Sequence, residues 1–490
     1  MAIGAKGEMD ATAWKLLGDA LLGTITLIAL GGAAATVIGA GAAFLVSLCR
    51  FPGRGVFEWL LAAPLAAPAY VLAFGYSSLT WAGGPVPLPL TGIAGAAFVY
   101  ALAFYPYAYL STRAALATQS AGALEAARML GAGPRRALIG VALPLARPGI
   151  AAGAALIAME IAADFGAASH FGATTVTTGL FRAWYAHGEP AVALRLASVL
   201  LIAAFGLLFV ERWMRGRARI AGGTWRAPPK VKLSAPAGLA AAMFCGLIIA
   251  LAFAAPLGWL ARLAATRPAS DFDELGRQLL NSFMLAGIGA AATLLVSIAI
   301  AAAARASQAG RAALFAASAG YAAPGAAIAL GALALFGAAR EMGLVGGLSA
   351  GLAVFMLVWT YASRFAAAGA QPIEAGLLRI TPSHTGAARL LGAGRMRRIL
   401  AIDLPMAAPS AAAAALIVFV EILKELPATL ILRPFDFDTL AVIAYSYASD
   451  ERLAQSAAPA LMVTAAGLVP ILLFTRRIDT ARPGTRMGGR

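Results

Sequence analysis

Residues 123–149 read ALEAARMLGAGPRRALIGVALPLARPG, and residues 384–410 read HTGAARLLGAGRMRRILAIDLPMAAPS. The second stretch begins 261 residues after the first, and twelve of the 27 positions are identical without a gap. Both stretches are basic and polar, in a chain that is otherwise strongly apolar. The duplication predicts two equivalent halves, each presenting the same docking element to something outside the apolar part of the molecule.

The composition is that of a membrane protein. Hydrophobic residues make up 61% of the 490 residues, charged residues only 12%, and the mean hydropathy is +0.81. Because a helix satisfies its own backbone hydrogen bonds in lipid, we predict an all-α polytopic membrane protein. Apolar runs of about 20 residues can cross a hydrocarbon core of ~30 Å. About eleven such runs are expected to be transmembrane helices, at 18–47, 57–80, 92–117, 145–168, 194–212, 236–262, 279–304, 311–336, 344–369, 406–430 and 457–475.

The net charge of +16 is explained by the membrane rather than by affinity for nucleic acid. The basic residues gather in short segments between the predicted spans, at 50–54, 128–136, 212–232, 305–311, 389–398 and after 476. With eleven spans these segments all fall on one side, and the acidic segments 271–274 and 436–451 fall on the other. Short basic loops stay in the cytoplasm, so we expect both docking elements and the C-terminus there.

At the offset of 261 residues the predicted spans of the two halves stay in step. We expect a first repeat at 1–212, a cytoplasmic linker at 213–235, an extra transmembrane helix at 236–262 and a second repeat at 263–490. The repeats share one orientation and have about five helices each, which makes this a parallel repeat. Cytoplasmic docking elements then place the N-terminus outside. Either this topology is real, or Met1 lies downstream of a true first helix, which is the interpretation we favour.

Each docking element is expected to form two short helices around a glycine turn. The Gly-Ala-Gly sequences at 131–133 and 392–394 supply the bend, since glycine adopts the left-handed conformation that ends many helices. The second helix of each element ends at Leu143-Pro144 or Leu404-Pro405, where proline suits the first turn of the following span. An ordinary amphipathic loop is the alternative, and the gap-free second copy argues against it.

This pattern resembles the EAA loop of ABC importer permeases, in which Glu-Ala-Ala is followed by a glycine and then by Leu-Pro. The resemblance implies the type I ABC importer permease fold. It also implies that each loop, at about 120–144 and 381–405, is a coupling element that docks on one ATP-binding subunit. The matching residues are Glu125, Ala126, Ala127, Gly131, Leu143 and Pro144 in the first copy and Gly386, Ala387, Ala388, Gly392, Leu404 and Pro405 in the second. Gly386 replaces the glutamate of the motif, so any salt bridge made by Glu125 would be absent from the second dock.

Further segments resemble the permeases of iron(III) importers. They are Asp164-Phe165-Gly166 and TTGLFRAW (177–184) in the first half, and LKELPAT (423–429), LRPF (432–435) and DTL (438–440) in the second. The resemblance covers nearly the whole chain and implies a permease that receives iron(III) from a periplasmic binding protein. Permeases for thiamine and other small solutes share much of the pattern and remain an alternative.

Four carboxylates lie within predicted spans, as the pairs Glu160/Asp164 and Glu421/Glu425. The spacing of four predicts that each pair projects from one helical face, roughly 24–30 Å beyond the Leu-Pro sequence, in the outer half of the membrane. Ionisable groups at this depth face an interior path or pair with each other, and Lys424 is a candidate partner for Glu425. They either line a translocation passage or form a structural set that pins an outer gate.

The chain has no G-x-x-x-x-G-K-[ST] phosphate loop and no catalytic or metal-binding motif, so we expect no cofactor on it and ATP use by a partner. We predict the membrane-spanning subunit of an importer in the bacterial inner membrane, served by two ATP-binding subunits and a periplasmic binding protein. An ion-coupled secondary transporter with the four carboxylates as proton relay is an alternative, and a membrane enzyme acting on lipid is another. Neither needs a paired EAA loop.

Overall fold

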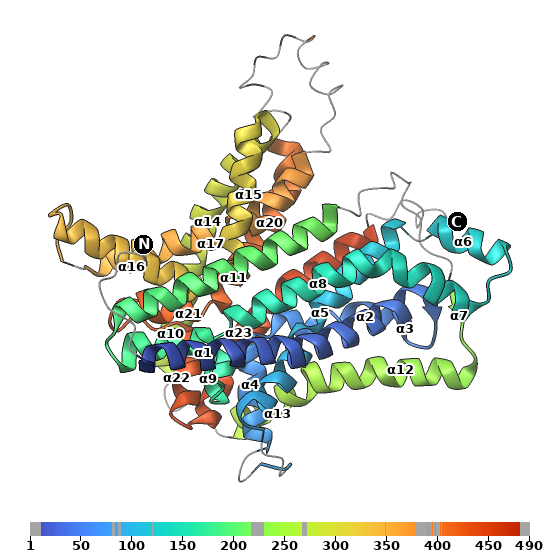
Figure 1. Cartoon of the computed structure of the whole chain (residues 1–490), viewed down its shortest axis with the longest axis horizontal. Coiled ribbons are helices and arrows are strands. Elements are labelled where there is room, and N and C mark those ends of the chain that lie inside the picture. Colours follow the sequence, from blue (N-terminus) through green and yellow to red (C-terminus); the bar gives the residue numbers. More distant parts are fainter. Residues whose placement is uncertain are drawn as a thin grey trace. The chain divides into compact units, whose positions relative to one another are not determined.

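The computed structural model describes residues 11–80, 84–86, 90–119, 121–216, 230–266, 272–347, 349–377 and 404–480, with residues 390, 392, 394, 397 and 402 between the last two ranges. This part of the chain is almost entirely helical (Figure 1). The first repeat contains α1 (Ala11–Leu27), α2 (Ala33–Leu48), α3 (Arg54–Leu60), α4 (Ala69–Thr80), α5 (Gly92–Gln119), α6 (Ala121–Met129), α7 (Pro134–Ala137), α8 (Leu143–Ala163), α9 (Gly166–His170), α10 (Val176–Phe181) and α11 (Pro190–Gly216).

The later part of the chain repeats this order of elements. After α12 (Ala235–Ile249) and α13 (Ala255–Thr266) come α14 (Phe272–Ala306), α15 (Gln308–Ala322), α16 (Gly325–Glu341), α17 (Ala350–Leu377), α20 (Leu404–Lys424), α21 (Pro427–Leu432), α22 (Leu440–Ser449) and α23 (Leu453–Thr480). The helices α8 and α20 begin and end at the same places when the offset of 261 is applied. A short helix follows each of them after a break, α9 in the first half and α21 in the second.

Eight helices of the described residues are long and apolar enough to cross a membrane, or up to ten if each of two bent pairs is one span. The sequence predicts about eleven. The last predicted span, 457–475, falls in α23, where the apolar stretch Leu453–Val469 is shorter than the others. The protein is therefore an all-α polytopic membrane protein.

The two bent pairs lie where the sequence predicts single spans at 57–80 and 311–336. The chain turns by 92° between Arg54–Ala66 and α4, and by 106° between α15 and α16. A proline lies in each break, and it disfavours helical backbone at the residue before it. Ala67 and Ala323, which precede these prolines, have extended ψ angles of 119° and 134°. Proline chemistry thus bends the same element in both repeats.

The chain divides into two compact units. One unit consists of residues 1–270 with 444–468, and the other of residues 271–443 with 469–490. Within the first unit α2, α5 and α8 pack on one another, and within the second α14, α17 and α20, which are their repeat equivalents, do the same. Small residues allow close approach: a Cβ at Gly153 would lie 2.6 Å from the Cα of Ala108, so α5 and α8 touch through their backbones.

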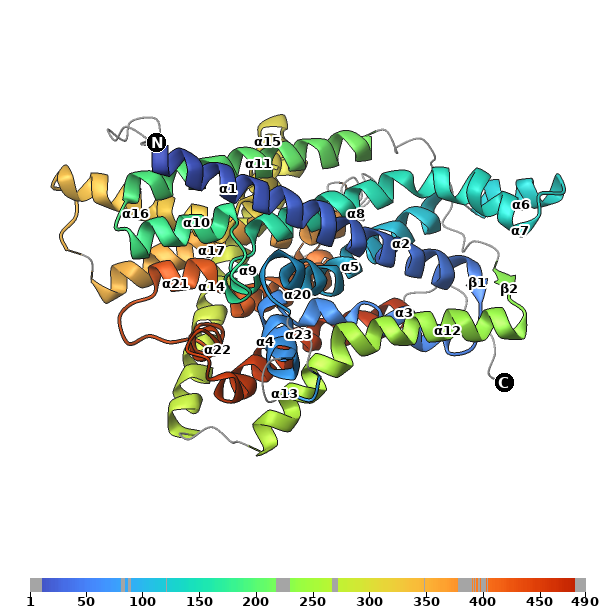
Figure 2. The same cartoon turned by 60° about the horizontal axis from the view of Figure 1, so that its bottom comes forward.

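The extra span packs within the first unit. A π-helical turn, Ala250–Ala254, joins α12 to α13, and the Tyr76 hydroxyl of α4 donates a 2.6 Å hydrogen bond to the Leu251 carbonyl in this turn. At the other end of α12, strand β2 (Val231–Lys232) pairs in parallel with β1 (Cys49–Arg50), as Figure 2 shows. The span predicted at 236–262 is thus attached to the first repeat just before its start, through β1, and near its middle, through α4.

Candidate functional site

The first docking element forms the predicted helix, turn and helix. Gly131 ends α6 with a left-handed φ of 81°, and the Ala132 amide donates a 2.9 Å hydrogen bond to the Ala127 carbonyl, which closes the end of the helix. Gly392 has the equivalent φ of 73° in the second copy. Both glycines adopt a conformation that side chains resist, so their place in the repeat follows from the shape of the turn.

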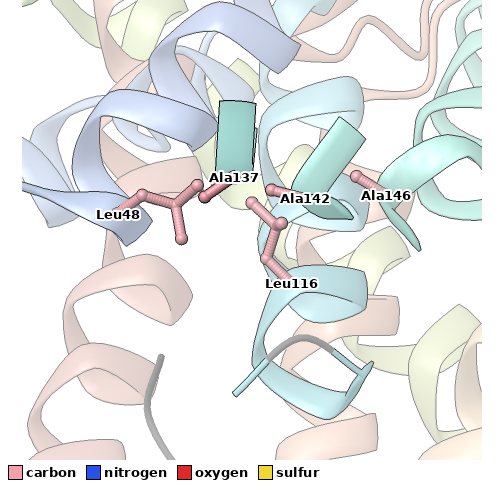
Figure 3. Close-up of a cluster of buried hydrophobic side chains, with 5 residues drawn as sticks. All are labelled: Leu48, Leu116, Ala137, Ala142 and Ala146. Carbon is pink, nitrogen blue, oxygen red and sulfur yellow. The ribbon is translucent and has the colours of Figure 1, made fainter. Parts of the chain in front are cut away.

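A small apolar cluster anchors this element to two spans. Ala137 of α7 and Ala142, which precedes α8, pack against Leu48 at the end of α2 and Leu116 near the end of α5 (Figure 3). All are buried, and Val141 packs on the same cluster. The base of the docking element therefore packs directly on the ends of α2 and α5.

The tip of the element carries exposed apolar side chains. Met129 is 90% exposed and Leu130 is 89% exposed, and Leu390, the repeat equivalent of Met129, is 91% exposed. Glu125 and Ala126 are also exposed, while Ala127 is half-buried. Such a tip suits a protein partner that removes it from water.

For the other predicted coupling residues, only their place in the chain bears on the predicted role. Gly386, Ala387 and Ala388 lie outside the described residues. Leu143 and Leu404 each begin a span, followed by Pro144 and Pro405 in the first turn, where the missing proline amide leaves no bond unmade.

At the other end of α8, Asp164 caps the next helix. The span ends at Ala163 and Asp164 has an extended ψ of 132°, so Glu160 and Asp164 do not share one face of a continuous helix as the spacing predicts. One Asp164 oxygen accepts hydrogen bonds from the Tyr100 hydroxyl at 2.7 Å and from the Ala167 and Ala168 amides at 3.0 and 3.2 Å. The carboxylate thereby supplies acceptors for the first amides of α9.

Glu425 plays the same part in the second repeat. Its Oε2 atom accepts hydrogen bonds from the Ala428 and Thr429 amides of α21 at 3.0 and 3.3 Å, at positions equivalent to Ala167 and Ala168. Its Oε1 atom accepts a 2.8 Å hydrogen bond from Arg364 of α17, with the carboxylate side chain only 3% exposed. The Tyr361 hydroxyl, equivalent to that of Tyr100, lies 2.7 Å from the Thr429 hydroxyl.

The ion pairs differ from those suggested by the sequence. Lys424 pairs with Glu421 at 3.0 Å, not with Glu425, whose cation is Arg364. Glu160 accepts a 3.1 Å hydrogen bond from the Tyr107 hydroxyl. Sequence reasoning missed Arg364, although an arginine inside a predicted span is itself a signal of a buried partner. Tyr100 and Tyr361 were also missed, yet they are identical residues at the repeat offset.

The described residues contain no group of three or more His, Cys, Asp or Glu side chains that could hold a metal ion. The four intramembrane carboxylates instead bind protein donors: tyrosine hydroxyls, backbone amides, Arg364 and Lys424. Their geometry supports the short outer helices α9 and α21.

The Arg364–Glu425 pair gives a direct test of this arrangement. Replacing Arg364 by glutamine leaves a buried carboxylate without its cation, which should lower the free energy of unfolding by about 3–5 kcal/mol. The measurement is the thermal unfolding midpoint of the purified protein in detergent. As a matched control, Lys424→Gln removes the more exposed pair with Glu421 and should cost about 0–1 kcal/mol. Equal shifts for the two variants would contradict the structural role given to Arg364.

Comparison with known proteins finds membrane transport components. Residues 16–218 match the family described as "Binding-protein-dependent transport system inner membrane component". The Fe(3+)-transport system permease protein FbpB 2 of Haemophilus influenzae is 26% identical over 469 residues, which cover 94% of this chain and 90% of that protein. The molybdenum transport system permease protein ModB of Escherichia coli K12 is 29% identical over 198 residues, which cover 37% of this chain and 86% of that protein.

These relatives are transport permeases and not enzymes. The family matched by residues 16–218 works with a binding protein, and it implies an ATP-binding partner. Residues 16–218 are thus similar to the inner-membrane components of binding-protein-dependent transport systems, and 94% of the chain is similar to a transport permease.

Proposed function

We propose that this permease imports iron(III) delivered by a periplasmic binding protein. The observation that carries the proposal is the similarity to an iron(III) permease along 94% of the chain, through both repeats and the extra span. The similarity to a molybdenum permease covers 37% of the chain. The iron-type segments around Asp164 and Glu425 also form equivalent structures in the two repeats.

In this proposal each docking element binds one copy of an ATP-binding subunit, so two copies serve one chain. The exposed apolar tips, Met129 and Leu130 in the first element and Leu390 in the second, would be covered in these docks. Both elements and the C-terminus then face the cytoplasm, in keeping with their basic charge. The chain itself holds no cofactor, and ATP is used by its partner.

The transport cycle follows from the repeat. ATP closes the pair of ATP-binding subunits, and the docking elements carry this movement to α2 and α5 through the cluster around Leu116. Rocking of the two repeats then switches the passage from inward-facing to outward-facing. The roles proposed for Glu160, Asp164, Glu421, Lys424 and Glu425 are to hold the outer gate, since their partners are protein groups.

The cargo is tested by uptake in a strain that lacks this gene. Radiolabelled iron(III) uptake should be lost and should return with the wild-type gene, while thiamine and molybdate uptake should not change. Loss of thiamine or molybdate uptake with normal iron(III) uptake would replace iron(III) by that solute and leave the importer class in place.

The glycine turns test the docks. In the double variant Gly131→Val, Gly392→Val, each new side chain must adopt a left-handed backbone, which costs about 1–2 kcal/mol per residue or more for a β-branched residue. A Cβ at either glycine meets no atom within 4 Å, so only the turn is disturbed. Uptake should fall severalfold at normal permease levels. The matched control is Gly133→Val, Gly394→Val, at open positions outside the left-handed region, and comparable loss in this control would contradict the role of the turns.

The anchoring cluster tests how movement is transmitted. Leu116→Ala empties a fully buried site and should weaken packing at the base of the first docking element by about 2–5 kcal/mol. In proteoliposomes that contain the whole transporter, cargo moved per ATP hydrolysed should fall severalfold. Leu110→Ala, on the same helix but 40% exposed, should leave this ratio unchanged. An unchanged ratio for Leu116→Ala would show that the cluster does not carry the movement.

A further inference from the structure

The short helix α9 lies at the outer end of the first repeat and is fixed there. It begins after the 21 residues of α8, a rise of ~30 Å from the docking element. Asp164 caps its first amides, and His170 in its last turn lies 2.6 Å from the Ser77 hydroxyl of α4. Burial lowers the pKa of His170 to about 4, so the imidazole is neutral at physiological pH. Both ends of α9 are thus held by groups of its own repeat.

Tyr445, a residue of the second repeat, contacts this helix. Residues 444–468 belong to the same compact unit as α9, although they come late in the chain. The Tyr445 and Ser169 hydroxyls lie 3.0 Å apart and share a hydrogen bond. The Tyr445 ring lies 5.3 Å from the ring of Phe165, which stacks on Phe181 at 3.7 Å. One side chain from the second repeat therefore meets a hydroxyl and an aromatic stack of the first.

This contact is light compared with those that hold α9. Asp164 and His170 bind α9 to its own repeat through several hydrogen bonds, whereas Tyr445 makes one hydrogen bond and one ring contact between the repeats. When two repeats rock against each other, contacts within a repeat persist and contacts between repeats exchange. The Tyr445 contact has the position and strength expected of a seal that opens and closes.

This contact also has no counterpart at the equivalent positions of the two repeats. The repeat equivalents of Tyr445 and Ser169 are Trp184 and Leu430. An indole and an isobutyl side chain cannot form the hydroxyl pair that Tyr445 and Ser169 form. The hydrogen-bonded seal therefore exists in one orientation only.

We propose that Tyr445 is a gate residue, whose contact with Ser169 and Phe165 seals the outer end of the passage and breaks when the permease turns outward. The proposal rests on the proposed function, because it needs a transporter driven by ATP. It assigns to Tyr445 a role in timing the release of cargo from the binding protein.

State-dependent cross-linking tests the gate. Ser169→Cys and Tyr445→Cys are combined in a background with both native cysteines replaced, Cys49→Ala and Cys245→Ala, in the complete transporter with its ATPase and binding protein. A short bismaleimide should join the pair without nucleotide, stop transport, and react severalfold less when a non-hydrolysable ATP analogue holds the outward state. The matched control, Ser77→Cys with His170→Cys, lies within one repeat and should cross-link equally in both states.

Equal cross-linking of Ser169→Cys/Tyr445→Cys in both states, or full transport by the joined protein, would overturn the gate. A separate result would contradict the proposed cargo. In that case the transporter that has not been cross-linked would hydrolyse ATP but move no iron(III). A second variant needs no cysteines: Tyr445→Phe removes only the hydroxyl and should raise ATP hydrolysis without binding protein severalfold. Tyr447→Phe, on the same helix with its ring against Arg452, should leave this rate unchanged. An unchanged rate for Tyr445→Phe would overturn the part given to the hydrogen bond.

Discussion

A helix that ends within a membrane protein leaves backbone groups that water cannot satisfy, and this constraint shapes the outer end of both repeats. The spans α8 and α20 stop at Ala163 and Lys424, and a new short helix starts three residues later. Asp164 and Glu425 supply the missing acceptors for the first amides of these helices. The position of everything beyond them, including α9 and α21, depends on two carboxylates.

At the end of the repeat that carries the docking element, neutral residues rather than carboxylates hold the structure. The docking element must present an apolar tip to water and still be attached firmly to the spans behind it. Left-handed glycines make the turn, and small alanines let Leu48 and Leu116 pack at its base (Figure 3). The helix α8 joins this base to Asp164, and it touches α5 through backbone contacts along the way. A movement at one end therefore reaches the other through closely packed helices rather than through a flexible chain.

The sequence was sufficient for features that depend on nearby residues. Hydropathy located the spans, and the repeated Gly-Ala-Gly located the turns, because both signals are local. The ends of helices were harder: a spacing of four suggested that Glu160 and Asp164 share a face, but the helix stops between them. Partners distant in sequence were missed altogether. Arg364 lies 61 residues from Glu425 and Tyr445 lies 276 residues from Ser169, and only packing brings them together.

The two repeats have the same order of elements, but the carboxylates that cap α9 and α21 have different partners. Glu425 has a buried cation in Arg364, whereas the equivalent of that arginine in the first repeat is Ala103, and the Asp164 carboxylate relies on the Tyr100 hydroxyl and two amides. Gly325 leaves room for the Arg364–Glu425 pair, since a Cβ there would collide with both groups. The Glu425 carboxylate therefore has a charged partner, whereas the Asp164 carboxylate has only neutral donors. The two repeats can differ in this way because they are parts of one chain. Each repeat is therefore always paired with the other repeat and not with a second copy of itself.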